Sequence, residues 1–383
     1  MENSKELDPV SLIDSVEKQV KKVHTTSLDI SLNEILDMYK NNELDIYPEY
    51  QRLFQWSVGA RSRFIESLLL EMPVPPIFVL EEDEGKYTLI DGLQRISSYL
   101  HLRGELVADH LEPSVKKGEK LVLMDCDIIP ELNGKTFDQL GTSLQIRLKR
   151  AFVRVEVIRK GSDPLLKYHM FKRLNNGGQL LTEQQIRNCT IRLLDSTFND
   201  FIIKLSKNDA FIDCIGTIAD SRIWQAQDQE LVLRFFALKN FRDKYKGYLG
   251  DFLTEYMEWV AKADAARKPV FYYAEEERVF TKTFELLSKA LGERSFGFYD
   301  RNAQRMTKGF SANNYEAITI GLQPVLESLS IDDSVICRKF EEKVLQMKSN
   351  PEYIALTAGG GKNSIGQLNK RIQFVTEQLL ELQ

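Results

Sequence analysis

The sequence predicts an α+β N-terminal domain followed by an all-α helical C-terminal domain. Between residues 27 and about 160, short apolar or alternating runs typical of strands lie between amphipathic helical segments. After about residue 164, the apolar residues recur at helical spacing. Because the chain has 383 residues, we expect more than one domain. We place an N-terminal extension at 1–26, the α+β domain at 27–190 and the helical domain at 191–383.

The first predicted elements are helices. Residues 1–26 resemble a polar amphipathic helix, which would serve as a lid or as a contact for a partner. Ser31 is placed to cap the next helix. A further helix spans Ala60 to Glu71, with its apolar residues at helical spacing, and the run Pro73-Val74-Pro75-Pro76 ends it.

Four strands are predicted in the same domain. Ile77 to Leu80 forms one, and the polar turn from Glu81 to Lys86 leads into a second strand that ends at Asp91. Leu121 to Met124 is an apolar run of strand length. Arg154 to Ile158 alternates between polar and apolar residues, which is typical of a half-buried strand.

The second half of the chain carries long helical patterns. No internal repeat accompanies them. The predicted helices span 228–239, 251–265, 274–291, 313–329 and 331–347.

The composition is that of a soluble globular protein, with 43% hydrophobic and 28% charged residues. Four cysteines without CxxC spacing indicate buried thiols in a reducing cytoplasm. No apolar run reaches the ~18 residues of a membrane span, and the polar N-terminus is unlike a secretory signal. We therefore expect a cytoplasmic protein with no membrane partner.

The net charge of −5 argues against a surface that is basic throughout and suited to nucleic acid. One segment is nevertheless strongly basic. Six cations and one acid, Glu156, lie between Gln145 and Lys160. Such charge runs are most often a solvated helix face and strand edge, and the functional alternative is a contact with a DNA backbone or with an effector protein. The DNA-binding candidates are Arg147, Lys149 and Arg150.

The most informative motif runs from Leu89 to Leu100. It predicts a buried strand ending at Asp91, a tight turn at Gly92 and a helix that carries Gln94 and Arg95. Such a junction directs free N–H groups and the positive end of a helix dipole at a ligand, most often a phosphate. An aspartate near a helix N-terminus and an arginine on a solvated helix face, with no ligand, would give the same local pattern.

Two further motifs have a similar character. Upstream, Tyr50-Gln51-Arg52 precedes Trp56 and supplies a second Gln-Arg pair, and arginine forks match phosphate oxygens. Downstream, Phe171 to Asn188 contains the turn Asn175-Asn176-Gly177-Gly178, followed by Thr182 in a capping-box pattern. A plain helix–turn–helix corner would also explain the downstream segment.

Taken together, these motifs resemble the N-terminal domain of GmrSD-type restriction endonucleases, within the ParB/sulfiredoxin-like superfamily. The matching boxes are Tyr50-Gln51-Arg52 with Trp56, the prolines from 73 to 76, Asp91 to Arg95, and Phe171 to Asn188. Leu93 departs from the family box, which usually has a glutamine there. The chain resembles stand-alone members that lack a His-Asn-His (HNH) nuclease domain and end in a loop, here Thr357 to Ser364, before an Arg-bearing helix with Arg371.

The resemblance implies a nucleoside triphosphate and Mg²⁺ as ligands, in a bacterial anti-phage or restriction system that binds foreign DNA. Hydrolysis of the triphosphate is implied as well. Leu93 occupies the position at which the family's glutamine would position a water molecule or a base for that reaction. The candidate catalytic residues are Asp91, Gln94 and Arg95. The candidate nucleotide-binding residues are Tyr50, Gln51, Arg52, Gly92, Arg95, Asn175, Asn176, Gly177 and Gly178.

Two other functions stay open at this point. The same domain would serve as a metal-dependent DNA nickase or nuclease, although the four histidines form no HExxH motif and we predict no protein metal site. The acidic chain and its long helical half also suit a non-enzymatic adaptor or immunity subunit for a co-encoded effector protein. Nuclease activity of the chain alone is not expected, and a homo-oligomer is left open.

Overall fold

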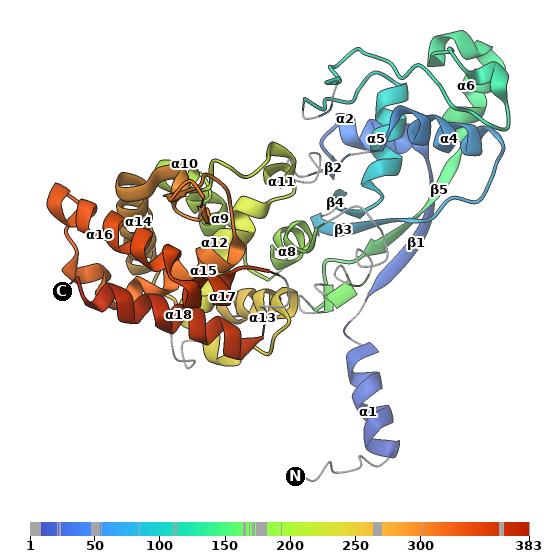
Figure 1. Ribbon diagram of the computed structural model, residues 1–383. Helices are drawn as coiled ribbons and strands as arrows, with labels where there is room; N and C mark the ends of the chain where they lie inside the picture. The colour runs from blue at the N-terminus through green and yellow to red at the C-terminus, as the bar shows by residue number, and fades with distance from the viewer. Residues whose placement is uncertain are drawn as a thin grey trace. The chain divides into compact units, whose positions relative to one another are not determined.

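The computed structural model divides the chain into two compact units, Met1–Leu181 and Thr182–Gln383. Figure 1 shows the elements of both units. The residues that the structure describes are 9–20, 22, 24–46, 54, 56–83, 85–109, 111, 113–163, 166, 167, 169, 170, 173, 182–192, 194–262, 270–300, 302–359 and 364–382.

The first unit is built on a five-stranded mixed sheet with the strand order β1-β5-β3-β4-β2. β1 is antiparallel to β5, β5 is parallel to β3, β3 and β4 form an antiparallel hairpin, and β2 is parallel to β4. The predicted hairpin and the predicted strand before Asp91 are thereby confirmed. The strand bounds are β1 Thr25–Ser31, β2 Leu44–Asp45, β3 Ile77–Asp83, β4 Lys86–Asp91 and β5 Phe152–Ile158.

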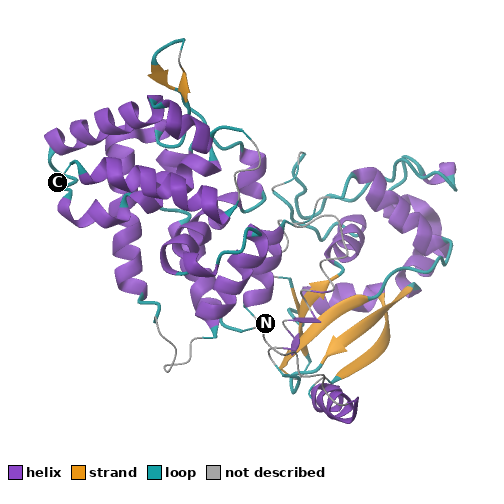
Figure 2. Cartoon of the chain, turned by 60° about the horizontal axis from the view of Figure 1, so that its bottom comes forward, coloured by secondary structure: helices purple, strands orange, loops and turns teal. Residues whose placement is uncertain are grey.

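Figures 1 and 2 show the helices α2, α4, α5 and α6 gathered on one side of this sheet. Val153, Val155 and Val157 alternate along β5 and are buried, as the alternating pattern predicts. Ser31 caps α2 by accepting the N–H of Glu34 at 3.1 Å, as expected. The helices are α1 Pro9–Val20, α2 Leu32–Lys40, α4 Val58–Leu69, α5 Leu93–Leu102 and α6 Gly141–Arg150, with 3₁₀ turns at Pro130–Leu132 and Phe137–Leu140.

One predicted strand is wrong. Leu121 to Met124 forms no ladder, although Leu121 and Leu123 are buried. The N–H of Leu121 instead donates to the carbonyl of His101, and that of Leu123 to the carbonyl of Lys135. These bonds run to a helix end and to a turn, so the extended segment packs as part of the core without joining the sheet.

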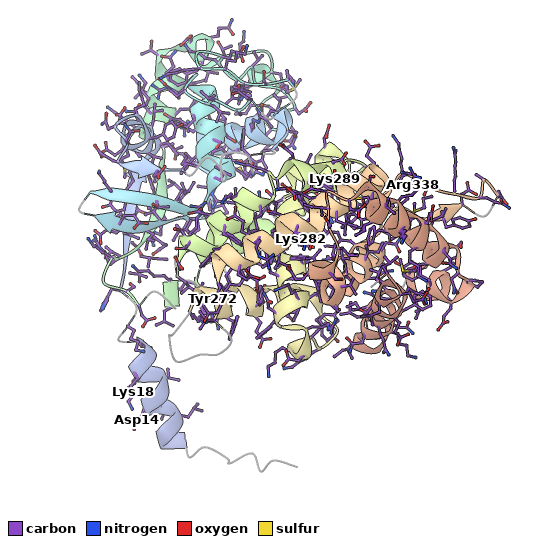
Figure 3. The ribbon with its side chains drawn as sticks, turned by 90° about the vertical axis from the view of Figure 1, so that its left-hand side faces the viewer. Asp14, Lys18, Tyr272, Lys282, Lys289 and Arg338 are labelled. Atoms are coloured by element: carbon purple, nitrogen blue, oxygen red, sulfur yellow. The ribbon has the colours of Figure 1, made fainter. Side chains whose placement is uncertain are left out.

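Helix α1 is amphipathic, and its apolar side chains are exposed. Its apolar side chains Leu12, Ile13, Val16 and Val20 are each more than half exposed. Figure 3 labels Asp14 and Lys18 on the same helix. The predicted amphipathic helix is therefore present.

The second unit is mostly helical, as predicted, with one short two-stranded ladder of β6 and β7. Its core contains many phenylalanine and tyrosine rings among aliphatic side chains, and the rings of Phe280 and Phe284 lie 4.5 Å apart between centroids at an interplanar angle of 44°. Its α-helices are α8 Glu183–Ile191, α9 Ser196–Leu205, α10 Asp209–Ile215, α11 Asp220–Trp224, α12 Gln227–Asn240, α13 Leu249–Ala261, α14 Tyr273–Leu291, α15 Ala312–Gly321, α16 Ser334–Ser349, α17 Pro351–Thr357 and α18 Ile365–Leu380. The strands are β6 Tyr299–Asp300 and β7 Arg305–Met306, and 3₁₀ turns span Arg242–Lys244, Gly292–Arg294 and Gln323–Ser328.

One helix of the second unit differs from its predicted extent. The pattern over 313–329 predicted a single helix, but α15 ends at Gly321 and a 3₁₀ segment follows from Gln323. Pro324 accounts for this break, because proline has no N–H to donate and clashes with the preceding turn of an α-helix.

Candidate functional site

The turn between β4 and α5 depends on Gly92. Its φ of 111° lies in the left-handed region that only glycine adopts without strain. A Cβ atom on Gly92 would also lie 2.8 Å from Cγ1 of Ile77. The glycine therefore allows the strand to turn directly into the helix while the junction packs against β3.

Asp91 and Arg95 form an ion pair one helical turn apart at this junction. Nη2 of Arg95 donates to Oδ2 of Asp91 at 2.9 Å and to the carbonyl of Pro76 at 3.0 Å. The Arg95 side chain is only 13% exposed, and its buried Nε has no hydrogen-bond partner among the residues that the structure describes. Asp91 thus orients the guanidinium.

Gln94 connects the first two motifs. Its Oε1 accepts the backbone N–H of Trp56 at 3.1 Å. The carbonyl of Trp56 accepts Nε of Arg61 at 2.8 Å, and the Arg61 guanidinium lies 4.6 Å from the ring centre of Phe54. The chain around Trp56 is therefore fixed beside the Asp91–Arg95 junction, although the two motifs are about 40 residues apart in the sequence.

His101 extends this connection into α5. Nη1 of Arg61 and Nδ1 of His101 are 3.0 Å apart, and because arginine can only donate, the ring nitrogen accepts. Burial, reinforced by the positive charge of Arg61, lowers the pKa of His101 from 6.5 to about 4. His101 is therefore neutral at physiological pH, with its remaining proton on Nε2.

Leu93, the departure from the family box, is buried as the first residue of α5. Its side chain is part of the core at this position. The remaining predicted nucleotide-binding residues lie outside the described residues: Tyr50, Gln51, Arg52, Asn175, Asn176, Gly177 and Gly178.

The predicted DNA-binding residues lie in the last turn of α6. Nη2 of Arg147 pairs with Glu71 at 2.7 Å, Lys149 lies 5.9 Å from the ring centre of Phe137, and Arg150 is exposed. Arg147 and Arg150 line a groove of about 780 Å³, whose lining also includes the exposed ring of Phe152. Cations in the last turn of a helix also stabilise that helix by interacting with its dipole. Their position alone is therefore explained without DNA.

The end of the third motif is structural. Arg187 on α8 is buried and bonds Glu230 of α12 and the carbonyl of Gly250 on α13. Asn188 donates to Gln229 of α12. These bonds fix α8 within the helical unit, so both polar side chains have a packing role.

Three residues at the β4–α5 junction and at the groove beside α6 were not predicted from the sequence. Arg61 and His101 carried no motif, and their roles follow from burial and from contacts across 40 residues. Phe152 looked like an ordinary strand residue, and its only signal was its place directly after the basic segment.

Among the described residues, no group of three or more His, Cys, Asp or Glu side chains could hold a metal ion. None of the described helices has the length and apolar character needed to cross a bilayer.

The first unit thus belongs to a class of α+β domains with a strand–glycine–helix junction. At this junction an aspartate orients an arginine, and the helix also bonds the chain at Trp56. Residues 32–192 match the family model of the GmrSD restriction endonuclease, N-terminal domain, and this part of the chain belongs to that family. The family places the chain in a restriction or defence context. Neither the curated proteins nor the solved structures gave a match.

Proposed function

We propose that this protein binds a nucleoside triphosphate at the β4–α5 junction and that the bound state controls recognition of foreign DNA in a restriction-type defence system. The observation that carries the proposal is the bond from the Trp56 N–H to Gln94, which holds Trp56, at the end of the first motif, beside the Asp91–Arg95 pair. Arg52 of the same motif lies outside the described residues, and in this proposal it supplies a second guanidinium for a polyphosphate.

The residues present fit an anionic ligand. The buried Nε of Arg95 has no partner within the described part of the chain, and an unpaired buried N–H is costly unless another group, a ligand or a water molecule accepts it. Gly92 places the N-terminus of α5 at the same point, with its free N–H groups and positive dipole. Arg95 would hold a phosphate and Asp91 would keep the guanidinium in place, while a Mg²⁺ ion would neutralise phosphate charge.

A thermal-shift screen tests nucleotide binding. The full chain is heated with each nucleoside triphosphate and Mg²⁺, since a ligand that binds the native state raises the melting temperature. One triphosphate should raise it, and Arg95→Ala should abolish that rise. Arg63→Ala removes an exposed arginine of α4 and should keep it. A wild-type chain that responds to no triphosphate would refute the proposal.

DNA binding rests on the last turn of α6. Three cations there should contact phosphates, so affinity for duplex DNA should fall steeply with salt as counterions are released. Reversal of Arg147, Lys149 and Arg150 to Glu should abolish binding. Metal-dependent cleavage of supercoiled plasmid by the pure chain, lost in Asp91→Ala, would instead favour a nickase.

A further inference from the structure

The groove beside α6 has an apolar floor and an arginine rim. It has a volume of about 780 Å³ and lies between the end of α4, the last turn of α6 and the first residues of β5. Exposed apolar side chains in its lining include Met72, Ile146 and Phe152. A volume of this size is in the range that holds a small organic ligand.

Phe152 is the most exposed large apolar side chain of the groove, at 66%. It is the first residue of β5 and pairs in register with Ser31 of β1. The preceding carbonyl, of Ala151, accepts the N–H of Leu32 at 2.9 Å. The backbone on both sides of the ring is thus held by the sheet, and the ring projects from it toward solvent, where a base can stack on it.

The charges of the rim favour an anionic ligand. Arg147 and Arg154 are paired with Glu71 and Asp29, but both pairs are solvent-exposed and such pairs contribute little stability. A phosphate can therefore replace either acid at small cost. Arg150 is exposed, and it has no partner in the part of the chain that the structure describes.

We infer that this groove takes one unstacked nucleotide of a DNA strand. The base stacks on Phe152, and the phosphates that flank it bind Arg150 and Arg147. A base within a duplex has both faces covered by its neighbours, so only an unpaired or extruded base can use the ring. This inference rests on the proposed DNA contact at α6 and adds the form of DNA that the groove selects.

The test compares three labelled DNAs by fluorescence anisotropy with the full chain. They are a paired duplex, the same duplex with one bulged base, and its single strand. Phe152→Ala should weaken binding of the bulged and single-stranded DNAs by about fivefold to 150-fold, since base–aromatic stacking is worth about 1–3 kcal/mol per base. Binding of the paired duplex should not change.

Two further variants serve as controls. Phe152→Trp should retain the preference for an unpaired base, because the indole also stacks. Phe298→Ala removes an exposed phenylalanine of the helical unit and should change nothing. Melting temperatures of all variants report whether the fold is intact.

The possible outcomes separate this inference from the proposal beneath it. If Arg150→Ala weakens binding of every DNA while Phe152→Ala changes none, the DNA contact stands and stacking is refuted. Equal loss for paired and bulged DNA in Phe152→Ala would also refute it. If no DNA binds and the groove instead takes an acidic peptide, the inference and the DNA contact both fail.

Discussion

Arg187 and Arg371 lie at the two ends of one chain of ion pairs in the helical unit. Arg187 pairs with Glu230 at 3.0 Å, Glu230 pairs with Arg234 at 2.9 Å, and Arg234 pairs with Glu316 at 3.0 Å. Glu316 also pairs with Arg371. The arginine that closes the third motif and the arginine of the last helix, which sequence analysis noted separately, therefore belong to one network across α8, α12, α15 and α18.

The centre of this network predicts a large loss of stability in Glu316→Gln. Glu316 is 6% exposed and contacts both Arg234 and Arg371. Its removal leaves two buried guanidinium groups without their shared acid, and breaking a buried pair in this way typically costs about 3–5 kcal/mol. Urea unfolding followed by circular dichroism measures the change.

Glu327→Gln is the matched control for the same measurement. Glu327 also contacts two cations, Arg278 and Lys282, but its side chain is 62% exposed. Water screens these pairs, so the loss should be far smaller. Figure 3 labels Lys282 on α14. Equal losses in the two variants would show that burial does not decide the strength of these pairs.

Gly92→Ala should destabilise the first unit more than Gly85→Ala. Both glycines have positive φ, 111° and 77°, so each substitution carries a backbone penalty of about 1–2 kcal/mol. Only at Gly92 would the new Cβ meet a neighbour, Ile77, at 2.8 Å, whereas Gly85 has nothing within 4 Å. Overpacking adds about 1–3 kcal/mol, and thermal unfolding of the two variants gives the difference. Similar melting temperatures would contradict the role of Ile77.

The sequence was sufficient for the architecture because periodicity reports which face of an element is buried. The alternation of β5, the Gly85 hairpin and the long helical patterns each required only local information. Pro324 would also have allowed the correct end of α15 to be predicted. Leu121 to Met124 was mispredicted because burial and extension do not specify a ladder partner.

The candidate site was predictable only in part. The turn at Gly92 and the neighbouring Asp91 and Arg95 follow from a local motif. The contact of Gln94 with Trp56 and that of Arg61 with His101 join residues about 40 positions apart. Such contacts depend on how helices pack on the sheet, which no local pattern specifies.

The lowered pKa of His101 predicts a loss of stability in acid. In the folded chain the pKa is about 4, against 6.5 for the ordinary side chain. Between these values the unfolded chain binds a proton that the folded chain does not, so stability falls as the pH drops from 6.5 to 4 and is level below. The full difference is on the order of 3 kcal/mol.

His101→Gln tests the origin of this acid sensitivity. The amide oxygen can still accept from Arg61 but does not titrate, so unfolding free energies at pH 7 and pH 5 should differ less than in the wild type. His24→Gln removes an exposed histidine and should leave the wild-type pH dependence unchanged. If His101→Gln keeps the full dependence, other groups are responsible.

The last prediction separates a positioning role of Gln94 from a purely structural one. Gln94→Met keeps the length of the side chain but removes the acceptor of the Trp56 N–H, which should cost about 1 kcal/mol of stability. Gln145→Met in α6 removes the bonds from Nε2 to the carbonyls of Phe137 and Asp138, and should cost at least as much. Only Gln94→Met should also lose the nucleotide-induced rise in melting temperature, because only it releases the chain at Trp56 from the Asp91–Arg95 junction. If both variants keep that rise, Gln94 contributes to the fold alone and the first motif needs no such anchor to bind the nucleotide.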